Sequence, residues 1–289
     1  MLFHATSKLN IRYLGILNLS SGRTVPICSQ GTHMITKNSI EVVILKCPYQ
    51  NWKNPDVGLH LNNMFSLKLE GYQKEYKYGV LPFDTTDFVA NHFLVYEKTS
   101  TGQTRLVSAL KSTPYHYCGP FHLEFNGIAM LKHGNGKPEH FEEMNAIIDD
   151  CMAKSRKLAY YSSWTILPEV RKDKQCIALI KNVVSALTYL AHVDDGIHHL
   201  IGLGVPRFKT DQYFETWGFE PILHQGKPLS HLYIESYSDV EVIVMQLKEY
   251  SALIKEKANL FSDLWEDRTT VGNPLDLSRF EDDLKKKAA

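Results

Sequence analysis

The sequence predicts a mixed α/β fold around a central sheet. Runs rich in β-branched and aromatic residues alternate with runs whose apolar residues recur at helical spacing, and glycine or proline separates most of them. From residue 59 the predicted order is helix, three strands, helix, strand, helix, strand, helix and strand. A chain of 289 residues is also long enough to bury a large core.

The first half is predicted to be rich in strands. Leu61, Phe65, Leu69 and Tyr72 are spaced for one helical face, and Thr101-Gly102 is typical of a hairpin turn. The expected elements are strands over 11–19, 24–28 and 40–47, a helix over 59–78, and strands over 92–97, 104–112 and 121–131.

The second half alternates more regularly. Pro138 suits the first position of a helix, where its missing N–H costs nothing. Ser238 and Glu241 form a capping-box pattern, and apolar residues continue in helical register to Phe261, which predicts a long helix over 238–268. The other expected elements are a helix from Pro138, strands over 158–167, 199–205 and 231–237, and helices over 175–192 and 210–217.

The domain organisation follows from this order. We expect an N-terminal β-rich extension (1–58), an α/β domain (59–237), the long C-terminal helix (238–268) and a charged tail (269–289).

Composition excludes several protein classes. Lysine plus arginine total 32 and aspartate plus glutamate total 32, so the net charge of zero argues against nucleic-acid or anionic-membrane binding. The five scattered cysteines form no CxxC pair, so we expect neither a disulfide framework nor a metal site. No run of ~18 apolar residues and no secretory leader is recognisable, which predicts a cytoplasmic protein without a membrane span.

A basic turn between a strand and a helix predicts an anion site. The strand over 158–167 ends at Pro168, Arg171-Lys172-Asp173-Lys174 follows, and the amphipathic helix begins at Gln175. Backbone N–H groups and the helix dipole attract anions at such a turn. Cations at a helix N-terminus oppose the dipole, and this cost favours a bound anion.

Three segments, in order, carry a resemblance to a known family. They are residues 83–96 (FDTTDFVANHFLVY) with the hairpin to Thr113, residues 164–180 (WTILPEVRKDKQCIALI) and residues 202–219 (GLGVPRFKTDQYFETWGF). Together they resemble the GCN5-related N-acetyltransferase (GNAT) superfamily, and more narrowly autoinducer synthases and N-acyl amino-acid synthases. The resemblance implies a mostly antiparallel central sheet flanked by helices, covering about residues 59–237.

The resemblance also implies a reaction. An acyl group would move from a thioester donor, acyl-CoA or the phosphopantetheine of an acyl carrier protein, to a small-molecule amine. The donor-binding residues would be Ile166, Leu167, Arg171, Lys172, Lys174 and Gln175, and Asp84 and Asp87 would bind the substrate amine. Tyr213 is the candidate thiolate acid. His122 and Glu124, which share one face of the predicted strand over 121–131, are candidate bases.

Four departures from the family pattern support a second reading. Lys111 stands at an arginine position, Lys174 and Cys176 replace glycines of the turn, and Phe214 occupies the tyrosine position, one residue after Tyr213. They favour a catalytically degenerate ligand-sensing or protein-interaction module, whereas the intact order of the three segments favours an acyltransferase.

Overall fold

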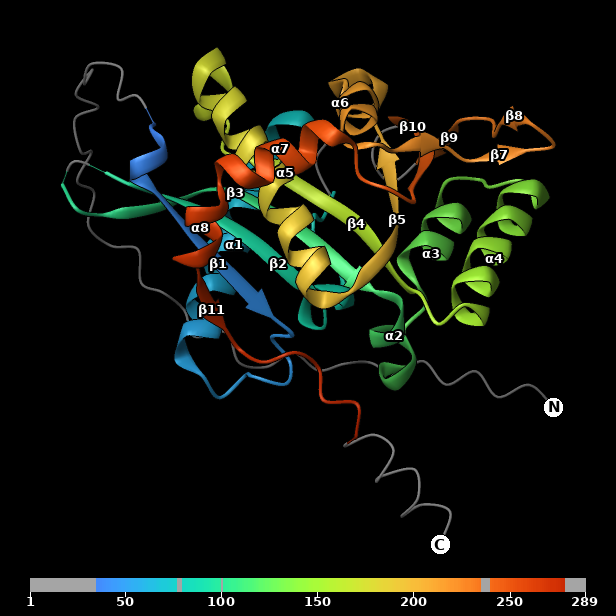
Figure 1. Ribbon diagram of the computed structural model, residues 1–289, viewed down its shortest axis with the longest axis horizontal. Coiled ribbons are helices and arrows are strands. Elements are labelled where there is room, and N and C mark those ends of the chain that lie inside the picture. Colours follow the sequence, from blue (N-terminus) through green and yellow to red (C-terminus); the bar gives the residue numbers. More distant parts are fainter. Residues whose placement is uncertain (1–34, 77–79, 100, 235–239, 279–289) are drawn as a thin grey trace, which may run out of the picture. The chain divides into compact units, whose positions relative to one another are not determined.

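The computed structural model describes residues 35–76, 80–99, 101–234 and 240–278 (Figure 1). The chain divides into two units, Met1–Met34 and Ile35–Ala289, and the following concerns the second. The strands predicted over 11–19 and 24–28 lie outside the described residues.

A nine-stranded sheet organises the described residues, in the order β11-β1-β2-β3-β4-β5-β10-β6, with β9 paired to β10. Its strands are β1 (Ile40–Lys46), β2 (Asn91–Lys98), β3 (Thr104–Pro114), β4 (Lys157–Ile166), β5 (Ile197–Gly204), β6 (Glu220–Pro221), β9 (Leu232–Ile234), β10 (Val240–Leu247) and β11 (Thr269–Val271). Strands β7 (Leu223–His224) and β8 (Lys227–Pro228) form a separate hairpin. Only the β4–β5 and β1–β11 pairs of the described sheet are parallel, so the predicted mostly antiparallel α/β fold is confirmed.

Helices cover both faces of this sheet. They are α1 (Pro55–Glu75), α2 (Tyr115–Cys118), α3 (Asn126–His133), α4 (Pro138–Ala153), α5 (Lys174–Asp195), α6 (Thr210–Trp217), α7 (Ala252–Leu260) and α8 (Ser262–Glu266). Helices α5 to α8 pack on one face, and α1, α3 and α4 pack on the other (Figure 1). The predicted helix over 59–78 begins earlier, at Pro55, because the Asn54 side chain caps it by accepting from the Asp56 N–H (3.0 Å).

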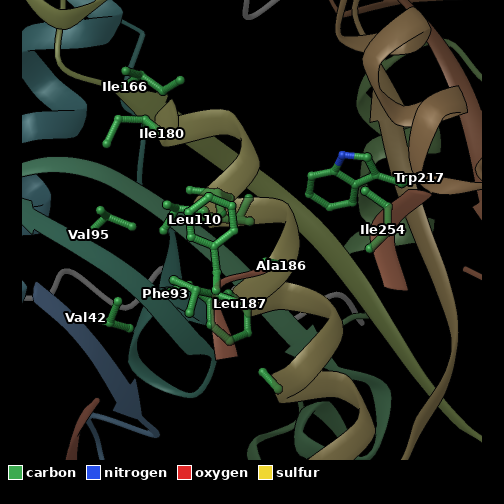
Figure 2. Packing of buried hydrophobic residues seen from close by; sticks show 14 of the residues in the cluster. Val42, Phe93, Val95, Leu110, Ile166, Ile180, Ala186, Leu187, Trp217 and Ile254 are labelled. Atoms are coloured by element: carbon green, nitrogen blue, oxygen red, sulfur yellow. The ribbon is translucent and has the colours of Figure 1, made fainter. Parts of the chain in front are cut away.

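The larger core lies between the sheet and α5. Figure 2 shows Ala186 and Leu187 of α5 beside Phe93 and Leu110, with Trp217 and Ile254 closing the far side. Helix α5 is long and apolar enough by composition to cross a membrane, but most of its apolar residues are buried in this core or packed against it. The hydrophobic effect therefore holds α5 against the sheet.

The strand predicted over 121–131 is wrong. The segment forms a 3₁₀ turn (Gly119–Phe121) and then α3, and His122, which has a left-handed backbone (φ 53°), ends the 3₁₀ turn. Phe125 and Leu131 bury their side chains in one cluster with Met144 of α4. His122 and Glu124 therefore do not share a strand face.

The long helix predicted over 238–268 is also wrong. Residues 240–247 form β10, which pairs with β5 and β9, and α7 and α8 follow. Val240, Val242 and Val244 alternate inward along β10, and β-branched residues suit a strand. The prediction holds only for the second part of this range, where Ile254 lies in α7 and is buried, as is Phe261 between α7 and α8.

The charged tail predicted over 269–289 begins with an ordered segment. Thr269–Val271 forms β11, parallel to β1, and Leu275 is buried beside Cys47 and Tyr117. The remainder of this tail, residues 279–289, lies outside the described residues.

We expect Gly218→Ala to destabilise the fold by about 2–4 kcal/mol. Gly218 ends α6 with φ 109°, and an added Cβ would stand 2.5 Å from the Glu249 carbonyl oxygen. Gly226 is the matched control, because it also has a positive φ (78°) but open space around its Cβ position. Urea denaturation should show a clearly smaller loss for Gly226→Ala, and equal losses would contradict the steric explanation.

Candidate functional site

The candidate site is a cleft where β4 and β5 separate. The two strands pair in parallel from Lys157 with Ile197 to Tyr161 with Gly202, and they diverge beyond that pair. The cleft encloses about 160 Å³. Its walls come from α1, β3, α3, β4, β5, α6 and β10: Tyr72, Tyr76, Asp84, Leu110, Asn126, Met130, Tyr160, Tyr161, Ser162, Ser163, Trp164, Leu203, Val205, Phe208, Thr210, Phe214, Ile234, Val240 and Val242.

A β-bulge shapes one wall of the cleft. The register of β4 against β3 shifts between Ala109 and Lys111, and Ser163 has a left-handed backbone (φ 55°). A non-glycine residue in this conformation is uncommon, and bulges next to functional sites redirect the main chain. Ser163 and Trp164 have no pairing partner in the described registers of β3 or β5. Their main-chain groups are therefore outside the β ladder where they line the cleft.

Two buried polar atoms of the mainly aromatic cleft lack hydrogen-bond partners. Ser162 Oγ and Asn126 Oδ1 are buried without a hydrogen-bond partner within the described parts of the chain. The Asp84 carboxylate lies at the same cleft and accepts weakly from Asn126 Nδ2 (3.5 Å). Buried polar atoms without partners are rare in folded proteins, so these atoms are suited to contact a ligand.

Asp84 and Asp87 cap the 3₁₀ turn Thr85–Phe88 and neutralise buried lysines. Lys68 Nζ donates to Asp87 Oδ1 (2.6 Å), and Lys111 Nζ lies 3.2 Å from Asp84 Oδ2 and 3.4 Å from Asp87 Oδ2. Lys68, Lys111 and Asp87 are essentially inaccessible to solvent, whereas the Asp84 side chain is 52% exposed. Of the two predicted amine-binding aspartates, the structure therefore places only Asp84 at the cleft.

The electrostatics of this cluster depend on burial. Burial lowers the pKa of Lys68 to about 8, against the opposing effect of Asp87. Burial alone would raise the pKa of Asp87, but Lys68 and Lys111 hold that pKa far below its ordinary value. Burial also lowers the pKa of His92 to about 4. The carboxylate of Asp87 is therefore charged and forms ion pairs with both lysines.

The basic turn is organised by its own residues. Arg171 Nε donates to the Ile166 carbonyl oxygen (2.7 Å), and its Nη1 pairs with Glu75 Oε1 (2.8 Å). Asp173 Oδ1 accepts from the N–H groups of Gln175 (2.8 Å) and Cys176 (2.9 Å). These bonds lower the pKa of Asp173 and leave its negative charge at the helix N-terminus. A phosphate bound at this turn would be repelled by the Asp173 carboxylate, which already occupies the helix N-terminus.

The other predicted donor residues lie around the same turn. Lys172, Lys174 and Gln175 are exposed, Ile166 is buried in the core, and Leu167 donates its N–H to the Val107 carbonyl oxygen (2.8 Å). None of these five residues lines the cleft. The structure thus places the predicted donor residues together but separates them from the cleft wall, which β4 contributes through residues 160–164.

Tyr213 does not line the cleft but packs behind Trp164, which does. Its ring packs at a tilt against Trp164 (5.5 Å between centroids) and edge-on against Trp217 (5.8 Å), and Lys181 Nζ lies 4.9 Å from its ring centroid. Burial raises the pKa of the Tyr213 hydroxyl. The neighbouring Phe214 lines the cleft instead, as expected for adjacent positions on a helix.

The two candidate bases lie apart from the cleft wall. His122 is exposed, and Glu124 pairs with Lys132 beside a shallow hollow that also contains Asp84. Sequence reasoning missed Ser162, Ser163 and Asn126. The serines could have been recognised as a pair of small polar residues inside an otherwise apolar strand. Asn126 could not, because the segment around it was predicted to be a strand and forms helix α3. No cluster of three metal-ligating side chains occurs among the described residues.

Comparisons with known proteins find similarity in solved structures. A scan of protein-family models gives no match, and neither does a search of curated proteins. FeeM, an N-acyl amino acid synthase from uncultured soil microbes, aligns at 14% identity over 78% of this chain and 97% of its own, with a TM-score of 0.45. MesI, a CoA-dependent acyl-homoserine lactone synthase, aligns at 12% identity over 77% and 95% of the two chains, with a TM-score of 0.45. An agmatine N-acetyltransferase variant aligns at 14% identity over 74% and 100%, with a TM-score of 0.36. These proteins are of the classes that the three sequence segments resemble.

Proposed function

We propose that the protein transfers an acyl group from a thioester to a small amine in the cleft between β4 and β5. The observation that carries this proposal is the bulge at Ser163–Trp164, which leaves these two residues unpaired in the β3–β4 ladder where they line a cleft with unsatisfied polar atoms. Acyl transfer needs donors for a developing oxyanion, and pre-positioned groups of this kind supply them.

The proposed reaction assigns a role to each wall. The amine nitrogen attacks the thioester carbonyl carbon, a C–N bond forms, and the C–S bond breaks as the thiolate leaves with a proton. The bulged strand and the Ser162 hydroxyl hold the carbonyl oxygen as its charge develops. Asp84 and Asn126 Oδ1 are acceptors that suit an amine on the opposite side of the cleft. Proximity alone lowers barriers by ~7–11 kcal/mol, so no strong acid is required.

Removing the Ser162 hydroxyl tests the oxyanion role. We expect Ser162→Ala to lower turnover of acyl-CoA with an amine panel by about 10- to 100-fold, because the reaction loses a donor to the oxyanion. Ser185→Ala is the matched control: Ser185 is also buried, but it bonds the Asn182 carbonyl oxygen on α5. The rate at which free thiol is released measures the turnover of both variants. Equal turnover in Ser162→Ala and Ser185→Ala would remove Ser162 from the mechanism.

The variant Tyr213→Phe tests whether the Tyr213 hydroxyl protonates the leaving thiolate. If Tyr213 is the thiolate acid, Tyr213→Phe should reduce turnover; its placement away from the cleft predicts unchanged turnover.

If a donor phosphate binds the turn, Lys174→Ala should weaken donor affinity and Asp173→Asn should strengthen it, because asparagine keeps the cap and removes the charge. Calorimetry with acyl-CoA and with an acyl carrier protein separates the two donors.

A second candidate is a non-catalytic ligand-binding module with the same cleft. The observation that favours it is the Asp173 carboxylate on the α5 N-terminus, together with the pairing of Arg171 to Glu75. Donor or amine binding without any thiol release, across both donor types, would establish this candidate. The cytoplasmic location remains a prediction of the sequence.

A further inference from the structure

A second set of reactive side chains lies outside the cleft, where α4 packs on β5. Cys151 Sγ is 3.6 Å from His199 Nδ1, and His199 Nε2 is 3.2 Å from Gln246 Oε1. These side chains come from α4, β5 and β10, and all three face the same side of the sheet. A thiol, an imidazole and an orienting amide in this order form the arrangement that activates a cysteine nucleophile.

The hydrogen bonds determine which imidazole nitrogen carries the proton. Gln246 Nε2 points to Glu220 Oε1 (3.4 Å), so Gln246 Oε1 faces His199. An amide oxygen only accepts, so Nε2 of His199 carries the hydrogen and Nδ1 presents its lone pair to Cys151. Burial raises the pKa of the Cys151 thiol and lowers the pKa of His199. The resting pair is therefore a neutral thiol beside a neutral base.

Cys151 lines a cavity of its own. The cavity encloses about 230 Å³, with Ile148, Leu158 and Cys151 as its buried apolar floor. Arg156 and Lys157 stand exposed at its rim. An apolar floor beside a thiol and a basic rim suits an acyl chain whose carrier is anionic.

We propose that Cys151 accepts an acyl group from a thioester with an anionic carrier, at a site separate from the β4–β5 cleft. The Cys151 proton moves to His199 Nδ1 as the sulfur attacks the thioester carbonyl. A new C–S bond forms on Cys151, the bond to the donor sulfur breaks, and the departing thiolate takes the proton from His199. The exchange consumes one thioester and forms another, so it needs no oxidant or further reactant. It also needs no amine, and it is independent of the proposed amine transfer.

The other described cysteines provide internal controls. Cys47, Cys118 and Cys176 are buried like Cys151, but Cys118 donates to the Pro114 carbonyl oxygen (3.9 Å), and no histidine bonds any of the three within the described residues. The experiment incubates the full-length Cys28→Ser protein with butyryl-CoA and no amine. Peptide mass spectrometry then follows a hydroxylamine-sensitive butyryl adduct on each cysteine.

We expect Cys151 to gain the adduct at least tenfold faster than the other three cysteines. Butyryl-pantetheine, which lacks the phosphates, should react more slowly than butyryl-CoA because of the basic rim. His199→Phe and Gln246→Leu should each slow the reaction at least tenfold, and Gln246→Glu, which retains an acceptor for Nε2–H, should keep it.

Equal adduct formation at Cys151 and Cys118 in the parent protein would overturn the proposal, even if the His199 variant fails to fold. Iodoacetamide labelling of Cys151 without any butyryl adduct would also overturn it, since the thiol would then be accessible but not an acyl acceptor. Loss of amine transfer in Ser162→Ala with unchanged Cys151 acylation would show that the two sites are separate.

Discussion

Asp87→Ala should cost about 3–5 kcal/mol of unfolding free energy, because it leaves buried lysine charges without their carboxylate. Lys68 Nζ pairs with Asp87 Oδ1 at 2.6 Å, and both side chains are fully buried. Lys111 would retain the half-exposed Asp84 and the neutral Thr86 hydroxyl (3.0 Å). Urea denaturation at pH 7 followed by tryptophan fluorescence measures the loss.

Glu70→Ala is the control for this prediction. Glu70 pairs with Lys74 at 3.3 Å on the same helix as Lys68, but both side chains are about half exposed. Such exposed pairs contribute about 0.3–0.5 kcal/mol. If Asp87→Ala lost no more stability than Glu70→Ala, the buried lysines would have to be neutral or rehydrated in the folded protein.

Acidification from pH 6.5 to pH 4 should reduce the stability of the parent protein steeply. Burial lowers the pKa of His192 from 6.5 to about 3, and that of His92 to about 4. In the unfolded chain both histidines bind protons near pH 6.5, while in the folded protein they stay neutral. The unfolded state therefore binds more protons in this window, and stability present above pH 6.5 is lost as the pH falls. The loss from His192 is on the order of 4 kcal/mol by pH 3.

His192→Phe should flatten this dependence. The variant loses the hydrogen bonds of His192 to Ser112 (3.1 Å) and Tyr250 (2.6 Å), so it should be less stable than the parent at pH 8. At pH 4 the difference should shrink or reverse, because phenylalanine takes up no proton. His198→Gln, at an exposed position, should keep the parent slope. A parent slope retained in His192→Phe would show that His192 is not the titrating group.

The sequence predicts the fold best where local and long-range signals agree. The β4–α5–β5 unit is predictable because its helix carries one long apolar face between Asp173 and Gly196, residue types typical of helix ends, and the structure uses both residues as caps. Residues 240–247 show the opposite case: their apolar side chains satisfy both a helical and an alternating pattern, and pairing with β5 decides the outcome.

The candidate site was predictable only in part. Asp84 and the basic turn were recognisable because they belong to contiguous segments. The bulge at Ser163 was not, because it arises from a register shift against β3 that only the paired strands reveal. The approach of Cys151 to His199 joins residues 48 positions apart, and no spacing pattern within either segment indicates it.

The parallel pairing of β11 with β1 has a consequence for the behaviour of the protein in solution. Thr269–Val271 occupies the side of Val43–Leu45 that β2 leaves open, so this part of β1 has strand partners on both sides within one molecule. A bare strand edge is a template on which another molecule can add its own strand, and this is a common route to aggregation. The segment from Thr269 to Leu275 thus covers the centre of β1 with a strand of only three residues, and a truncation that removes this segment should expose β1 and promote aggregation.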